Sequence, residues 1–237
     1  MEAILQLESL ESGYGEVQVL WGVSLQVQPG KMTTIIGANG AGKTTTLLTT
    51  MGRLRAWGGR VIFKGQDVTH LPAYAKVQLG LVLVPEGRKL FSGMTVRENL
   101  EMGAYCPRSR KLIARNVDRV YTLFPKLKDR LRQKAGTLSG GEQQMLAIAR
   151  GIMEEPQVLM IDELSLGLSP VLAQQLFLTL KTLKGQGLTI VLIEQNVHLA
   201  LALGDYAYVL AEGRVHLEGP SHQVANLDEI RKAYLGV

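Results

Sequence analysis

Cysteine, histidine, aromatic residues and long apolar runs are all scarce in this chain of 237 residues. The single cysteine, Cys106, excludes an internal disulfide, and there is no cysteine–histidine cluster to form a zinc site. No apolar run approaches the roughly 20 residues that span a bilayer. The N-terminal stretch MEAILQLES also lacks the basic and then apolar order of a signal peptide. We therefore expect a protein of a reducing compartment that reaches any membrane only through a partner.

The charge balance is mildly basic, with 26 lysines and arginines, 21 acidic residues and a net charge of +5. Such a balance suits anionic ligands such as nucleotides, although scattered surface lysines and arginines explain it equally well. The densest basic cluster is RSRKLIAR at 108–115, whose apolar residues have helical spacing. We interpret this cluster as the solvated face of a helix, and we expect no nucleic-acid partner.

Three short apolar runs predict strands that are buried on both faces of a parallel sheet. They are LGLVLVP at 79–85, PQVLMID at 156–162 and LTIVLIE at 188–194. Between the first two, helical periodicity at 95–105 and 109–124 predicts a helical subdomain over 87–155. The expected fold is a single α/β domain over 1–237 with this subdomain inserted in its nucleotide-binding core.

The segment GANGAGKT at Gly37–Thr44 matches the phosphate-loop pattern G-x-x-x-x-G-K-[ST] between an expected strand and an expected helix. In such a loop, backbone amides and a helix N-terminus surround phosphate oxygens. Lys43 reaches the β- and γ-phosphates, and the Thr44 hydroxyl is a ligand for Mg²⁺. The residues expected to bind nucleotide here are Gly37, Ala38, Asn39, Gly40, Ala41, Gly42, Lys43, Thr44 and Thr45.

Two carboxylates end the apolar run VLMIDE at 158–163. A strand end is rigid, so Asp162 can join the shell of a magnesium ion, while Glu163 points elsewhere and can polarise an attacking water. Phosphoryl transfer depends on such positioning and charge neutralisation. Alone, the pattern is weak, because many strands simply end in solvent. Together with a phosphate loop, it predicts Asp162 as a metal ligand and Glu163, with Lys43, as catalytic.

A second glycine motif, LSGGEQQ at 138–144, resembles a phosphate cradle at the start of a helix, yet it contains no lysine. We also expect a glycine of this motif to be the N-cap of the helix EQQMLAIARGIM that follows, because capping and phosphate binding use the same free backbone amides. Both interpretations can hold together.

The three motifs GANGAGKT, LSGGEQQ and VLMIDE resemble the ATPase subunits of ABC transporters over essentially the whole chain. The resemblance implies ATP and Mg²⁺ as cofactors. It implies that Ser139, Gly140 and Gly141 bind the γ-phosphate of the ATP held by the other subunit of a dimer. It also implies that Tyr14, in ESGYGEV, stacks on adenine. The implied fold is a P-loop α/β domain with a mostly parallel sheet and a small antiparallel β layer.

Several positions depart from the usual pattern of this family. Glu86 stands where most relatives have a glutamine that links magnesium to the permease contact, and Gln195 stands where most have a γ-phosphate-binding histidine. We expect Glu86 among the metal ligands with Thr44 and Asp162, and Gln195 in the catalytic set, and we interpret the nearby His198 as a helix-surface residue. Leu164 replaces a usual proline, which should loosen its turn slightly.

The strings VPEGRKLF, DELSLGLSP and IEQN resemble one branch of the family, the LivF-type ATPases of branched-chain amino acid importers. This resemblance implies two membrane permeases, an external solute-binding protein and a cytoplasmic, peripheral place on the inner face of the cell membrane. It also implies a second, LivG-type ATPase. The unusual Glu86 and Gln195 favour a heterodimer with two unequal sites, and a homodimer stays open.

Two alternative functions stay open at this point. The ATPase of a urea or short-amide importer shares much of the same pattern. A non-transport ABC ATPase of DNA repair or translation belongs to a different class, but such proteins usually carry two ATPase domains or a long coiled-coil insertion, and this chain has neither. A pure binding module is disfavoured because Glu163 is present.

Overall fold

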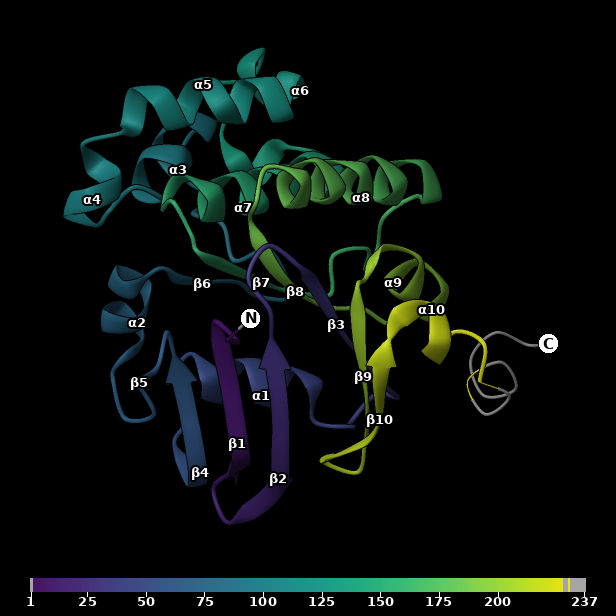
Figure 1. The fold of residues 1–237 in the computed structure, drawn as a ribbon. Helices are drawn as coiled ribbons and strands as arrows, with labels where there is room; N and C mark the ends of the chain where they lie inside the picture. The colour runs from purple at the N-terminus through teal and green to yellow at the C-terminus, as the bar shows by residue number, and fades with distance from the viewer. Residues whose placement is uncertain (1, 228–229, 231–237) are drawn as a thin grey trace.

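Two β-sheets lie one above the other in the computed structural model, which describes residues 2–227 and 230 (Figure 1). The larger sheet has the strand order β10-β9-β3-β8-β7-β6, and the smaller has the order β2-β1-β4-β5. The strands are β1 (Leu5–Tyr14), β2 (Val17–Val27), β3 (Met32–Ile36), β4 (Ala56–Phe63), β5 (Gln66–Asp67), β6 (Leu81–Val84), β7 (Val158–Asp162), β8 (Thr189–Ile193), β9 (Tyr206–Ala211) and β10 (Arg214–Pro220). The expected mostly parallel sheet and small antiparallel layer are both confirmed.

In the larger sheet, every neighbouring pair of strands is parallel except β9 with β10. β3, β7 and β8 are buried along their whole length, which explains why their sequences are nearly continuous apolar or β-branched runs. Parallel strands end at the same edge of a sheet. The segments that begin at Gly37, Glu163 and Glu194 therefore leave this edge side by side.

Helices lie on both faces of the larger sheet (Figure 1). α1 packs between the two sheets, where Leu47 joins a core with Leu10, Val23 and Ile193. α7 and α8 cover the opposite face through a second core that includes Leu146 and Leu180. The helices are α1 (Lys43–Thr50), α2 (Ala73–Leu79), α3 (Val96–Met102), α4 (Pro107–Arg110), α5 (Ile113–Leu123), α6 (Pro125–Lys128), α7 (Gly140–Met153), α8 (Pro170–Gly185), α9 (Val197–Leu203) and α10 (Ser221–Val224).

The helical segment between β6 and β7 comprises α3, α4, α5, α6 and α7. α3, α5 and α6 pack on α7, on the side away from the larger sheet (Figure 1). A short 3-10 turn at Ala135–Thr137 leads into α7. The boundaries of the expected subdomain, 87–155, stay a prediction, as does the assignment of 1–237 to a single domain.

The helical periodicity noted over 109–124 does not form one continuous helix, because α4 and α5 are separated by a turn at Lys111 and Leu112. Leu112 has a non-helical φ of -112° and ψ of 9°. α4 is held instead by contacts with the end of α7: the buried Ser109 donates to the Glu154 carboxylate, and Arg108 donates to its carbonyl. These tertiary contacts override a helical periodicity that continues through the turn. The basic side chains around the turn are exposed, as expected for a solvated cluster.

Candidate functional site

The phosphate loop joins β3 to α1 in a backbone conformation that depends on glycine. Gly42 has a φ of 100°, and a Cβ atom there would lie 2.9 Å from the Leu20 side chain. A Cβ atom on Gly37 would lie only 2.2 Å from the carbonyl oxygen of Leu210 on β9. Larger residues would therefore strain the loop at both of its ends. Glycine at both positions therefore lets the ends of the loop pack closely against β9 and against the Leu20 side chain.

Lys43 is the first residue of α1, and its side chain turns back along the loop. Its Nζ atom donates to the carbonyl oxygens of Gly37 at 2.9 Å and Ala38 at 3.0 Å. Burial lowers the pKa of Lys43, while the nearby Glu163 and Asp162 carboxylates oppose that change. The ammonium group is thus held at the phosphate loop by uncharged carbonyls, which a phosphate oxygen can replace as stronger acceptors.

A cavity of about 440 Å³ opens beside this loop. It brings together most of the site residues expected from the sequence, namely Tyr14, Asn39, Gly40, Gly42, Lys43, Thr44, Thr45, Glu86, Glu163 and Gln195. Val19 and Leu166 also line it and were missed. Val19 carries no recognisable signal, whereas Leu166 belongs to the string DELSLGLSP quoted above. Gly37, Ala38, Ala41 and Asp162 belong to the same loop and strand end but do not line the cavity.

Tyr14 ends β1 at the rim of this cavity. The side chain is 48% exposed, and its hydroxyl oxygen accepts a long hydrogen bond of 3.4 Å from Thr45 Oγ1. The ring is therefore anchored at its hydroxyl end to the first turn of α1. An exposed aromatic ring beside a phosphate loop offers a stacking surface to a nucleobase.

Asp162 and Thr44 supply a donor set that fits Mg²⁺. Thr44 Oγ1 donates to Asp162 Oδ1 at 3.2 Å, which joins the start of α1 to the end of β7. Burial raises the pKa of Asp162 to about 6, and the negative charges of Glu163 and Glu86 add to this rise. A bound cation would offset the same burial and repulsion. Among the described residues, no three histidine, cysteine, aspartate or glutamate side chains form a metal cluster, and Mg²⁺ commonly takes its remaining ligands from water and phosphate.

Glu163 and Gln195 meet at the cavity wall. Gln195 Nε2 donates to Glu163 Oε1 at 2.6 Å, and the Glu163 backbone amide donates to the Ile193 carbonyl oxygen at 3.0 Å. Glu163 has a φ of 54°, in the left-handed region that non-glycine residues rarely adopt. These contacts fix the carboxylate that was expected to polarise water. The same contact shows that Gln195 orients Glu163, a relation that the two sequence motifs did not indicate.

The glycines of the second motif do not line this cavity. Ser139 caps α7 through a capping box, in which its backbone amide and hydroxyl both donate to Glu142 at 2.9 Å and 2.8 Å. Ser139 is exposed, and Gly140 is half-buried. The motif therefore caps the helix, as expected, but the N-cap residue is Ser139 and the expected glycine N-cap is wrong. Binding of the partner's nucleotide by Ser139, Gly140 and Gly141 stays a prediction.

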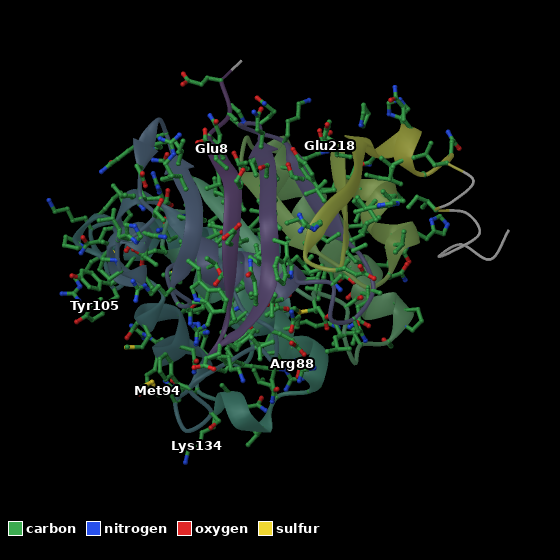
Figure 2. All side chains as sticks on the ribbon, turned by 90° about the horizontal axis from the view of Figure 1, so that it is seen from below. Glu8, Arg88, Met94, Tyr105, Lys134 and Glu218 are labelled. Atoms are coloured by element: carbon green, nitrogen blue, oxygen red, sulfur yellow. The ribbon has the colours of Figure 1, made fainter. Side chains whose placement is uncertain are left out.

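Arg88 connects the segment after β6, which contains Glu86, to the second motif. Sequence reasoning missed it. It follows Glu86 in VPEGR, and its Nη1 atom donates to Gln143 Oε1 of the second motif at 3.1 Å. Arg88 lies on the side of the molecule that also carries Met94 and Lys134 (Figure 2). Its place in a quoted string was the available signal, but no local pattern indicates which residue it contacts.

His198 is exposed on α9, as expected.

Comparison with known proteins agrees with this geometry. The sequence model of the family described as "ABC transporter" matches residues 20–165. The chain belongs to the ABC transporter family. It is 42% identical over 98% of its length to the whole of the high-affinity branched-chain amino acid transport ATP-binding protein BraG of Pseudomonas aeruginosa. It is 35% identical to the probable branched-chain amino acid transport ATP-binding protein LivF of Archaeoglobus fulgidus, with 99% of each chain covered.

The fold also matches solved structures of this family. A crystal structure of the ADP conformation of an ATP-binding cassette of an ABC transporter has a TM-score of 0.84 at 31% identity, with 100% of each chain covered. The chain is thus an ATP-binding subunit that hydrolyses ATP in a transporter, and it works with a dimer partner and permeases. In the described part of the chain, no helix is long and apolar enough to cross a membrane.

Glu163→Gln and Lys43→Ala should separate turnover from binding. Glu163→Gln should lower the rate of ATP hydrolysis by at least about 100-fold, since general bases commonly supply that much, while ATP affinity stays within about twofold. Lys43→Ala should weaken ATP binding by about 10- to 100-fold, the usual worth of a hydrogen bond to a charged group. Phosphate release and binding of a fluorescent ATP analogue measure the two effects.

The matched control for this pair is Glu212→Gln. Glu212 is an exposed glutamate with a similar left-handed φ of 48° in the turn after β9, outside the cavity. The Glu212→Gln variant should hydrolyse ATP at the parental rate. Undiminished hydrolysis by Glu163→Gln would contradict the assignment of Glu163 as the catalytic carboxylate.

Proposed function

We propose that this chain is one of two different ATPases of a branched-chain amino acid importer, bound peripherally to permeases at the cytoplasmic face of the membrane. The observation that supports it most directly is the cavity in which the phosphate loop, Glu163 and Gln195 meet. The second support is the similarity over nearly the whole chain to relatives whose names include branched-chain amino acid transport.

In this proposal, each residue of the cavity has a separate task. Backbone amides of residues 37–42 and the Lys43 ammonium bind the phosphates, and Tyr14 stacks on adenine. Thr44 and Asp162 hold Mg²⁺, with Glu86 close by; the ion, when bound, neutralises charge on the β- and γ-phosphates. Glu163 accepts the proton of the attacking water, and Gln195 orients Glu163 through the hydrogen bond at 2.6 Å.

The permeases require a docking surface, and a groove of about 630 Å³ between the larger sheet and the helical segment suits this role. Exposed or partly exposed apolar side chains line it, including Tyr74, Pro85, Phe91, Met102 and Tyr105. Tyr105 is 70% exposed and lies at the outer edge of the molecule (Figure 2). Pro85 lines this groove while its neighbour Glu86 lines the nucleotide cavity. One short segment therefore connects permease docking to the site of hydrolysis.

Transport of branched-chain amino acids is tested by deleting the gene and measuring uptake. Uptake of leucine, isoleucine and valine should fall, because the permeases lose the subunit that hydrolyses ATP, and urea uptake should be unchanged. Re-expression of the parental chain should restore uptake, and re-expression of Glu163→Gln should not. Loss of urea uptake with normal uptake of the three amino acids would replace this substrate assignment with the short-amide alternative.

Ser139→Arg should impair hydrolysis without affecting nucleotide binding to the monomer. Ser139 lies outside the chain's own cavity and is proposed to contact the partner's γ-phosphate, so ATP affinity of the monomer should stay within about twofold. ATP-dependent dimer formation, measured by size-exclusion chromatography with light scattering, should be lost. Thr95→Arg is the matched control, because Thr95 and Glu98 form the same capping box on α3. A collapse of monomer affinity in Ser139→Arg alone would contradict action on the partner's ATP.

The charge around Glu86 and Gln195 supports the proposed heterodimer. The Glu86 carboxylate adds negative charge next to Asp162, where a glutamine would not. Gln195 donates a hydrogen bond but cannot carry the positive charge that a histidine can. We therefore expect the site on this chain's phosphate loop to be slow and the partner ATPase to supply the faster site.

Glu86→Gln combined with Gln195→His should raise ATP hydrolysis by the purified chain alone. The change removes one negative charge and introduces a side chain that can be cationic, so negative charge on the γ-phosphate is better stabilised. Steady-state phosphate release of the double variant is compared with that of the parent and of each single variant. Rapid hydrolysis by the parental homodimer, together with no gain in the double variant, would favour local compensation at Glu86 and a homodimer.

A further inference from the structure

Glu194 directly follows β8 and is only 1% exposed. Glutamate is rarely buried to this extent without hydrogen-bond partners, because a desolvated carboxylate is costly. Glu194 does not line the nucleotide cavity; its side chain lies against the segment that follows β7. A buried carboxylate beside a catalytic segment requires an explanation that the proposed tasks of the cavity residues do not include.

Each oxygen of the Glu194 carboxylate accepts a short hydrogen bond from Ser165. Oε1 accepts from the Ser165 backbone amide at 2.7 Å, and Oε2 accepts from Ser165 Oγ at 2.8 Å. The backbone amides of Gln195 and Asn196 also hydrogen-bond this carboxylate. Burial raises the pKa of Glu194, and these donors oppose the rise. We call the pair of contacts with Ser165 the Glu194–Ser165 bridge.

The bridge is the third connection between the same two segments. The Glu163 amide donates to the Ile193 carbonyl oxygen, and Gln195 donates to the Glu163 carboxylate. Glu163 keeps a left-handed φ of 54°, a conformation that persists only where the surroundings over-determine it. Residues 163–165 are therefore held at two points. Gln195 binds the Glu163 carboxylate, and the bridge holds Ser165, two residues further along the chain.

We propose that Glu194 is a positioning residue for ATP hydrolysis, which acts through the Glu194–Ser165 bridge. The bridge fixes the turn after β7 and so keeps the Glu163 carboxylate at the cavity in contact with Gln195. It also fixes Leu166, the next residue after Ser165, which lines the same cavity. The inference rests on the proposed catalytic role of Glu163.

A purely structural role for Glu194 makes a different prediction. Loss of a buried carboxylate that only stabilised the fold would lower the melting temperature but leave the turnover of the folded protein unchanged. Loss of a positioning residue lowers kcat while KM for ATP stays nearly constant, because the phosphate loop is untouched. The split between kcat and KM therefore distinguishes the two roles.

The test compares Glu194→Ala with Glu194→Gln in the purified full chain. Glu194→Ala should lower kcat by about 10- to 100-fold, the usual effect of a small misplacement of a reacting group, with KM for ATP within about twofold. Glutamine has the same shape, keeps an acceptor for the Ser165 amide, and can donate to Ser165 Oγ, which is able to accept. Glu194→Gln should therefore keep kcat within about threefold of the parent.

Ser165→Ala examines the other half of the bridge. It removes the hydroxyl contact but keeps the backbone contact, so kcat should fall by less than in Glu194→Ala, about three- to tenfold. In the double variant, Ser165→Ala should cause no further loss, since both residues act through one contact. Losses that multiply independently would overturn the bridge as the route of action.

The remaining outcomes are also decisive. A parental kcat in folded Glu194→Ala, or a fall in kcat that only accompanies a rise in KM, overturns the proposal. If Glu194→Ala does not fold, as judged by circular dichroism, a parental kcat in Ser165→Ala has the same consequence. Glu163→Gln is the control for the underlying assignment. Turnover by Glu163→Gln at the parental rate would overturn both the catalytic role of Glu163 and the positioning role of Glu194. An inactive Glu163→Gln with a fully active Glu194→Ala would overturn only the positioning role.

Discussion

The parallel register of β3, β8 and β7 is the constraint on which the site depends. Ile35 lies opposite Ile193 in one pairing, and Asp162 lies opposite Ile193 in the next. All three strands therefore end within about one residue of the same line, and each continues into a functional segment. A shift of one residue in either pairing would move one functional segment along the edge relative to the other by about 3.3 Å. The observed pairing of these strands thus sets the positions of the phosphate loop and of Glu163 relative to each other.

The charges gathered at this edge determine what the cavity can bind. Asp162, Glu163 and Glu86 contribute three carboxylates, and Lys43 is the cation that lies among them. An anionic nucleotide would add further negative charge, so side chains alone do not make the cavity attractive to phosphate. The backbone amides of the loop and the N-terminus of α1 provide positive potential without a side chain. A divalent cation would supply the remaining positive charge, which is consistent with the raised pKa of the buried Asp162.

The sequence could predict features that depend on neighbouring residues, but not contacts between residues far apart along the chain. The buried strands, the phosphate loop and the VLMIDE strand end are each specified by neighbouring residues, and the structure contains all of them. The Gln195–Glu163 contact and the Glu194–Ser165 bridge join residues about thirty positions apart, which no local periodicity encodes. The break between α4 and α5 has the same origin, because Glu154 near the end of α7 holds Ser109. Most residues that line the candidate cavity were therefore recognisable from motifs, whereas the contacts that orient them were not.

The capping box of α7 bears on how two such chains could share ATP. Ser139 donates from both its backbone amide and its hydroxyl to Glu142, so a carboxylate already occupies the Ser139 donors among those proposed for the partner's γ-phosphate. Arg130 pairs with the same carboxylate at 2.9 Å. On the proposed assignment, a phosphate replaces Glu142 as the acceptor, and Arg130 retains the displaced carboxylate. On this assignment, the chain without its partner has little affinity for free phosphate at the start of α7. An ATP presented by a partner chain can compete successfully, because the phosphate loop of that chain has already bound and oriented it.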